Sequence, residues 1–280
     1  MTRLTPDDIT SIADELQTYD KELVTKTGCS LRGIACQAAG ITESELKKVS
    51  ADVRVGVIPI TFGQGVIKGF SEAVAGIVAH MGCRAFVTQA VDVAGFAEAV
   101  ENKADIIMFA DDDRFVAIDI ARRQVVDNAA ATAKGFVAGL SLMATGLKQK
   151  NVLVLGCGAV GSCATETLAK LGANVSIHDV DPFRCKELAK KLRSSLKAEI
   201  KVAAELESSL LLHQLIVDAT PAAAIIRAHH ISPQTYISAP GVPIGLDTDA
   251  QVKISKRLLH DPLQIGVATM VVYALKSYIL

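Results

Sequence analysis

The spacing of hydrophobic positions divides the chain into three stretches, and the first of them has a helical period. After a helix start at Thr5-Pro6-Asp7-Asp8, apolar side chains recur three and four residues apart. Thr42 and Glu45 stand three residues apart, in the pattern of a capping box that opens a further helix. Residues 1–52 are therefore predicted to form a small helical bundle.

The middle stretch alternates short β-rich runs with amphipathic runs. Strands are predicted at residues 53–60, 85–88, 106–110 and 115–120, and helices at 66–80, 94–102 and 129–147. An alternation of strand and helix favours a parallel sheet with right-handed crossovers. Residues 53–148 are therefore predicted to be a small parallel α/β substrate-binding region.

The last stretch opens on an apolar strand that runs directly into a glycine-rich turn. Strands are predicted at residues 152–155, 174–178, 215–219 and 236–238, and helices at 162–171 and 182–194. Gly172 stands where a helix-ending glycine belongs. Residues 149–280 are therefore predicted to be a Rossmann domain with a doubly wound parallel sheet, which makes the whole chain an α/β protein.

The turn after residue 155 carries the pattern Gly156-x-Gly158-x-x-Gly161, and Asp179 follows at the end of the next strand. The first glycine permits the tight turn, the second lets the backbone approach a pyrophosphate, and the third allows close helix–strand packing. Ala159 and Val160 complete the turn, where the helix N-terminus offers N–H groups to the phosphates. A methyltransferase also uses a glycine-rich first turn, but the third glycine favours a dinucleotide.

Asp179 points to NAD as the cofactor. Its carboxylate is placed to accept hydrogen bonds from the adenosine ribose, and it would repel the 2′-phosphate of NADP. Arg184 could serve NADP only if Asp179 turned away. Two later loops, with Thr220-Pro221 and Pro240-Gly241, also follow parallel strands, so they are either cofactor-binding loops or ordinary turns.

Composition narrows the class of partner. The formal net charge is −1, with 29 Lys+Arg against 30 Asp+Glu, which argues against nucleic-acid binding. The first residues lack the apolar core of a signal peptide, and no apolar run reaches bilayer length. We therefore expect a cytoplasmic protein with no membrane partner. A near-zero charge favours self-association and allows a homodimer.

The six cysteines and six histidines match no metal-site spacing, so the cysteines are predicted to be reduced thiols, mostly buried, and no metal is expected. The pair His229-His230 is predicted to cap the end of a helix. In the middle region, Asp111-Asp112-Asp113 ends an apolar strand, where it could bind a cation or form a solvated turn. The turn at residues 61–65 follows another strand and should face the same crevice. These residues indicate an NAD-dependent dehydrogenase acting on something small and cationic.

The middle region also carries a resemblance. Residues 56–67, with Gly69-Phe70-Ser71-Glu72, resemble the pyrrolysine synthase family, which contains NAD-dependent dehydrogenases acting on 3-methylornithyl-lysine. Matching segments occur in the same order along the chain: Leu4-Thr5-Pro6, Phe109-Ala110-Asp111-Asp112-Asp113, Ala219-Thr220-Pro221, Pro240-Gly241-Val242-Pro243 and Asp261-Pro262-Leu263. The resemblance runs nearly end to end.

The resemblance implies the last step of pyrrolysine biosynthesis, in which a terminal amine is oxidised and the product closes to a pyrroline ring. It implies that Asp111 grips the substrate amine and takes its proton, and that Leu4, Phe62, Phe70 and Asp112 shape the substrate site. The chain departs from the family pattern at Phe62, Lys68 and His260-Asp261. Two alternatives stay open: an amino or imino acid dehydrogenase for another basic substrate, and a non-catalytic NAD-binding sensor.

Overall fold

The computed structural model describes residues 4–279 and divides into two compact units. The first unit contains the described residues through Glu22, Cys29–Gly135 and the chain from Pro262 onward. The second contains Leu23–Gly28 and Phe136–Asp261. This division differs from the predicted segments 1–52, 53–148 and 149–280, because the C-terminal helix joins the first unit.

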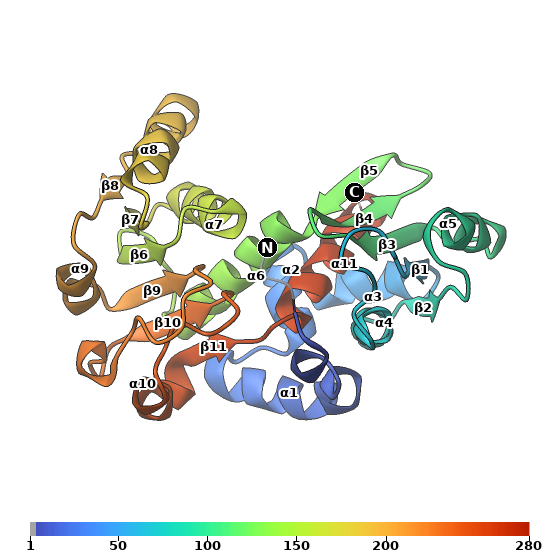
Figure 1. The fold of residues 1–280 in the computed structure, drawn as a ribbon, viewed down its shortest axis with the longest axis horizontal. Coiled ribbons are helices and arrows are strands. Elements are labelled where there is room, and N and C mark those ends of the chain that lie inside the picture. Colours follow the sequence, from blue (N-terminus) through green and yellow to red (C-terminus); the bar gives the residue numbers. More distant parts are fainter. Residues whose placement is uncertain (1–3, 280) are drawn as a thin grey trace. The chain divides into compact units, whose positions relative to one another are not determined.

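The second unit contains a doubly wound parallel sheet, as predicted. Its strands lie in the order β11-β10-β9-β6-β7-β8, and every neighbouring pair is parallel (Figure 1). The strands are β6 (Asn151–Leu155), β7 (Asn174–His178), β8 (Lys201–Val202), β9 (Leu215–Asp218), β10 (Tyr236–Ala239) and β11 (Leu258–His260). The order reverses at β6, whose two neighbours are β7 and β9, so the crevice that binds ligands in such sheets is expected beside β6.

Helices and short 3-10 turns connect these strands. They are α7 (Ala159–Lys170), α8 (Pro182–Leu196), α9 (Leu206–Leu212), η2 (Ala228–His230), α10 (Thr248–Ile254) and η3 (Ser255–Arg257). Leu153, Ile216 and Ile237, from three adjacent strands, are fully buried in one hydrophobic cluster. After α7, Gly172 has φ +76, as expected of a glycine that ends a helix.

The sheet of the first unit contains the predicted parallel strands, and two antiparallel strands extend it, so the sheet is mixed. Its order is β2-β1-β3-β4-β5, in which β2, β1 and β3 are parallel and β4 and β5 are antiparallel additions. The strands are β1 (Arg54–Ile58), β2 (Arg84–Val87), β3 (Ile106–Ala110), β4 (Phe115–Asp119) and β5 (Gln124–Asp127). The turn between β3 and β4 is too short for a crossover, so β4 must run back along β3.

Side chains cap two helices of this unit, at Ser30 and at Thr42. The helices of this unit are α1 (Ile12–Thr27), α2 (Leu31–Ala39), α3 (Glu43–Ser50), α4 (Phe70–His80), α5 (Asp92–Glu101) and α11 (Gln264–Ile279). The last residues of α1 belong to the second unit, and α6 (Asn128–Met143) also continues into it. The predicted capping box is present: Thr42 N–H donates to Glu45 Oε2 at 2.7 Å, and Glu45 N–H donates to Thr42 Oγ1 at 3.2 Å.

Two predicted helix starts are corrected. The Thr5–Asp8 pattern forms a short 3-10 helix, η1 (Pro6–Asp8), and α1 begins only at Ile12. The helix predicted from residue 66 begins at Phe70, because Gly63, Gly65 and Gly69 all have positive φ and keep the preceding segment in turns. No helix among residues 4–279 combines enough length and apolar character to cross a membrane.

Candidate active site

The glycine-rich turn joins β6 to α7, and its three glycines have different surroundings. A Cβ on Gly161 would lie 1.8 Å from the Gly156 carbonyl oxygen, so only glycine allows the helix to approach the strand. Gly156 has φ +87, and a Cβ there would lie 2.8 Å from the Ala219 oxygen. A Cβ on Gly158 would meet no atom within 4 Å. The chain is therefore tightly packed at two glycines and open at the one expected to face a pyrophosphate.

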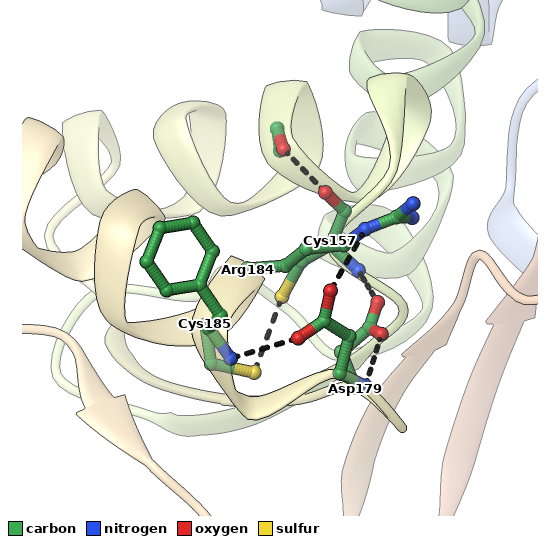
Figure 2. A network of polar contacts seen from close by, with 7 residues as sticks. Cys157, Asp179, Arg184 and Cys185 are labelled. Carbon is green, nitrogen blue, oxygen red and sulfur yellow. Dashed lines mark hydrogen bonds and ion pairs between the residues drawn. The ribbon is translucent and has the colours of Figure 1, made fainter.

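Asp179 follows β7, and its carboxylate lies against the glycine-rich turn. Oδ2 accepts a hydrogen bond from Cys157 N–H at 2.6 Å, and Oδ1 accepts one from Asp181 N–H at 2.9 Å (Figure 2). Arg184 Nε lies 3.5 Å from Asp181 Oδ2, so its guanidinium is paired with a neighbouring acid. Two backbone N–H groups thus hold the Asp179 carboxylate at the carboxyl end of β7.

Two thiols lie beside this carboxylate. The sulfur atoms of Cys157 and Cys185 are 3.5 Å apart, and a dashed line joins them in Figure 2. Burial raises the pKa of both thiols, which keeps them protonated and uncharged next to Asp179. All six cysteines are free thiols, and four are buried.

Two further loops pack together at the carboxyl ends of β9 and β10. Gly241 N–H donates to the Asp218 carbonyl oxygen at 3.1 Å, and a Cβ on Gly241 would lie 2.1 Å from the Thr220 oxygen. The Thr220 hydroxyl donates to Asp218 Oδ1 at 2.7 Å. Burial raises the pKa of Asp218 to about 6, although the hydrogen bonds from Thr220 oppose the shift. In the sequence, Asp218 carries only the signal of an acid that ends an apolar strand, at the start of the segment Asp218-Ala219-Thr220-Pro221.

These residues of the second unit fit a nicotinamide dinucleotide. The glycine-rich turn at the carboxyl end of β6 offers open space at Gly158 and the N-terminus of α7. The Asp179 carboxylate, at the carboxyl end of β7, contacts the same turn at Cys157 N–H. Ala159 and Val160 form the first turn of α7, while Thr220-Pro221 and Pro240-Gly241 follow β9 and β10 at the same edge. We expect these residues to hold the cofactor.

Asp111 lies in the first unit, in the turn between β3 and β4. Its Oδ1 accepts hydrogen bonds from the backbone N–H groups of Asp113 at 2.9 Å and Arg114 at 2.7 Å. The side chain of Arg114 pairs with Asp127 on β5, where Nη2 lies 3.2 Å from Oδ2. The carboxylate of Asp111 is therefore exposed but fixed by its own turn.

The other predicted substrate residues are placed differently from one another. Phe62 is 77% exposed, in the turn after β1. Phe70, the first residue of α4, stacks edge-on against Phe115, with ring centroids 5.4 Å apart. Leu4 is half-buried just before η1. Asp112 contacts the turn that holds Phe62, because its Oδ2 accepts a hydrogen bond from Gln64 N–H at 2.8 Å.

Within residues 4–279, one group of potential metal ligands comes together: Glu207, His229 and His230. Both Nε2 atoms approach Glu207 Oε1, at 2.8 Å from His229 and 3.0 Å from His230. His230 Nδ1 accepts a hydrogen bond from Arg227 N–H at 2.9 Å, so the ring proton of the neutral side chain lies on Nε2. A ligating histidine needs the opposite tautomer, and the arrangement therefore disfavours a metal. Because His230 accepts from Arg227, it caps the start of η2, not the end of a helix as predicted.

Two family models match successive stretches of the chain. Residues 8–126 match the family described as the N-terminal domain of the pyrrolysine biosynthesis protein PylD. Residues 125–232 match the C-terminal domain of alanine dehydrogenase/PNT.

Two curated relatives match along nearly the whole chain, so the chain belongs to their family. The pyrrolysine synthase of Methanosarcina acetivorans is 31% identical over 271 residues, which cover 96% of this chain and 98% of that protein. The pyrrolysine synthase of Methanosarcina barkeri is 32% identical, with 96% and 97% covered.

Solved structures share the fold at low identity. Shikimate dehydrogenase from Aquifex aeolicus has a TM-score of 0.56 and 18% identity, covering 82% of this chain and 94% of that one. Quinate dehydrogenase from Corynebacterium glutamicum, solved in complex with NAD, has a TM-score of 0.53 and 14% identity, covering 80% and 92%.

Proposed function

Because the chain belongs to the pyrrolysine synthase family of nicotinamide-dependent dehydrogenases, we propose that it uses NAD⁺ to oxidise 3-methyl-D-ornithyl-N6-L-lysine to pyrrolysine. One combined observation carries the proposal. The chain aligns with pyrrolysine synthases over 96% of its length, and its Asp111 and Asp179 carboxylates are each held by two backbone N–H groups. Fixed carboxylates of this kind suit recognition of an ammonium group and of ribose hydroxyls.

We propose NAD and not NADP as the cofactor because of the negative charge of Asp179. Its carboxylate is held at the carboxyl end of β7 by Cys157 N–H and Asp181 N–H. A fixed negative charge there accepts hydrogen bonds from ribose hydroxyls and repels a phosphate on the same ribose. Arg184, the nearest cation in sequence, is paired with Asp181. A bound nicotinamide supplies the hydride acceptor for the oxidation.

Asp111 is proposed as the catalytic residue. Its carboxylate is exposed at the carboxyl end of β3, and the N–H groups of Asp113 and Arg114 fix its direction. A fixed carboxylate binds the substrate ammonium by charge and then accepts its proton, which leaves the neutral amine that hydride loss requires. Phe62, Phe70 and Leu4 are proposed to contact the apolar parts of the same substrate.

The proposed reaction balances in three steps. The carbon bearing the terminal amine loses a hydride to the nicotinamide, and the amine becomes an iminium. Water adds to the iminium and ammonia leaves, which gives an aldehyde. The α-amine of the methylornithine then attacks the aldehyde, and loss of water forms the pyrroline ring.

An activity assay separates this proposal from its alternatives. The protein is mixed with NAD⁺ and lysine acylated on its ε-nitrogen by 3-methyl-D-ornithine, and NADH absorbance and product mass are followed together. The proposal predicts NADH together with the mass of the cyclised product. NADH with other basic amino acids alone would favour an amino acid dehydrogenase. Tight NAD binding without NADH from any of these substrates would favour a cofactor sensor.

A further inference from the structure

Two acidic side chains hold the turn that follows β1, from opposite ends. At its start, Thr61 donates both its backbone N–H and its hydroxyl to Asp92, the first residue of α5, and the N–H bond is 2.7 Å long. At its fourth residue, Gln64 N–H donates to Asp112 Oδ2 at 2.8 Å. Asp92 lies 31 residues from Thr61 and Asp112 lies 48 residues from Gln64, so the two carboxylates tie the turn to the start of α5 and to the turn between β3 and β4.

The contact with Asp112 is built into the shape of the turn. Gly63 has φ +74, and a Cβ on it would lie 2.1 Å from Asp112 Oδ2. The carboxylate therefore rests directly against the backbone of Gly63 while it accepts from Gln64. Phe62, 77% exposed, stands between the residues that the two acids hold.

We propose that Asp112 is a positioning residue, which fixes the Phe62–Gln64 backbone beside Asp111 and does not bind the substrate ammonium by charge. This proposal takes its substrate from the proposed function. It replaces the part in the substrate site that the resemblance implies for Asp112. Asp111 and Asp112 are adjacent, yet their carboxylates have different partners: Asp111 accepts from its own turn and Asp112 from the turn after β1. Asp111 is thus assigned to the substrate amine, and Asp112 to the position of the neighbouring turn.

The two roles make opposite predictions for Asp112→Asn. An amide oxygen can still accept from Gln64 N–H but carries no charge. A positioning role therefore predicts that Asp112→Asn keeps the wild-type KM for methylornithyl-lysine, while Asp112→Ala raises it about tenfold. Asp113→Asn removes one charge from the same turn and is the matched control, for which we expect wild-type kinetics. If Asp112→Asn and Asp112→Ala raise KM equally, the positioning role is overturned.

A second measurement needs no turnover. Hydrogen exchange of the Gln64 backbone amide, followed in the full chain without substrate, should become about tenfold faster in Asp112→Ala. It should stay near the wild-type rate in Asp112→Asn and Asp113→Asn. Unchanged exchange in Asp112→Ala would overturn the proposal even if the enzyme is active. The two proposals can also fail separately. If the wild-type protein does not oxidise the substrate while the Gln64 amide exchanges faster in Asp112→Ala, the proposed function is contradicted and the positioning role is supported.

Discussion

At the scale of single residues, each of the two units carries carboxylates that are held by backbone N–H groups. Asp179, Asp111, Asp112 and Asp92 each accept at least one such bond. A carboxylate fixed in this way loses little conformational entropy when a ligand arrives, so its charge acts at a defined point. The net charge of −1 says nothing about these local charges.

Replacing Asp179 tests the choice of cofactor. Asp179→Ala removes the acceptor for the ribose hydroxyls and the charge that opposes a 2′-phosphate. We expect NAD to bind about tenfold more weakly and the preference for NAD over NADP to narrow, as measured by titration with each reduced cofactor. Glu187→Ala, which removes an acid from the middle of α8, is a control for general loss of charge. An unchanged NAD-to-NADP ratio would contradict the ribose role.

Asp218 gives the folded protein a predictable response to pH. Its side chain is fully buried, and its pKa rises from 3.8 to about 6. Because the folded state holds this proton more tightly, the contribution to stability is complete below pH 3.8 and is lost as the pH rises to about 6. The loss amounts to roughly 3 kcal/mol.

The measurement compares unfolding free energies of wild type and Asp218→Asn by denaturant titration between pH 4 and 7. Asparagine cannot ionise, so the free energy of wild type should fall relative to the variant as the pH rises. A difference that stays constant over this range would contradict the raised pKa. The comparison is needed because hydrogen bonds lower the pKa of Glu45, Asp92 and Glu98, whose contributions change with pH in the opposite direction.

At the scale of elements, the features predicted best from sequence are those set by neighbouring residues. From Asn151 to Lys170, a strand, a glycine turn and a helix follow one another as predicted. The residues that specify these three elements are close together in the sequence. The antiparallel β5 was not predicted, and β4 was predicted as a strand without its antiparallel direction, since strand pairing is a contact across the fold. The same limit applies to the site: Asp92 and Asp112 meet their turn only through folding.

The glycine turn allows a paired test of fold against cofactor binding. Gly158→Ala adds a methyl group into open space at φ −71, so the melting temperature should stay the same while NAD binding weakens about tenfold or more. Gly161→Ala would place Cβ 1.8 Å from a carbonyl oxygen, so it should lower the melting temperature itself. Thermal unfolding with and without NAD separates the two effects. Wild-type NAD affinity in Gly158→Ala would contradict the assigned pyrophosphate position.

At the scale of the whole molecule, the C-terminal helix α11 packs against α2, which lies early in the chain. Tyr273 Oη donates to the Ala38 carbonyl oxygen and Lys276 Nζ to that of Ala39, both at 2.7 Å, so α11 is tied to α2. Division of the sequence by local pattern assigned these residues to the Rossmann segment, because no local signal marks a helix that packs against the other end of the chain. The α/β class and the doubly wound sheet were predictable; the membership of α11 was not.

The central claim is that this chain removes a hydride from the carbon bearing the terminal amine of methylornithyl-lysine. The most direct test uses substrate with both hydrogens on that carbon replaced by deuterium, with mass spectrometry of the reduced cofactor and the product. The account predicts one deuterium on the nicotinamide and one on the imine carbon of the pyrroline ring. Reduced cofactor without deuterium, or a ring that keeps both, would contradict it.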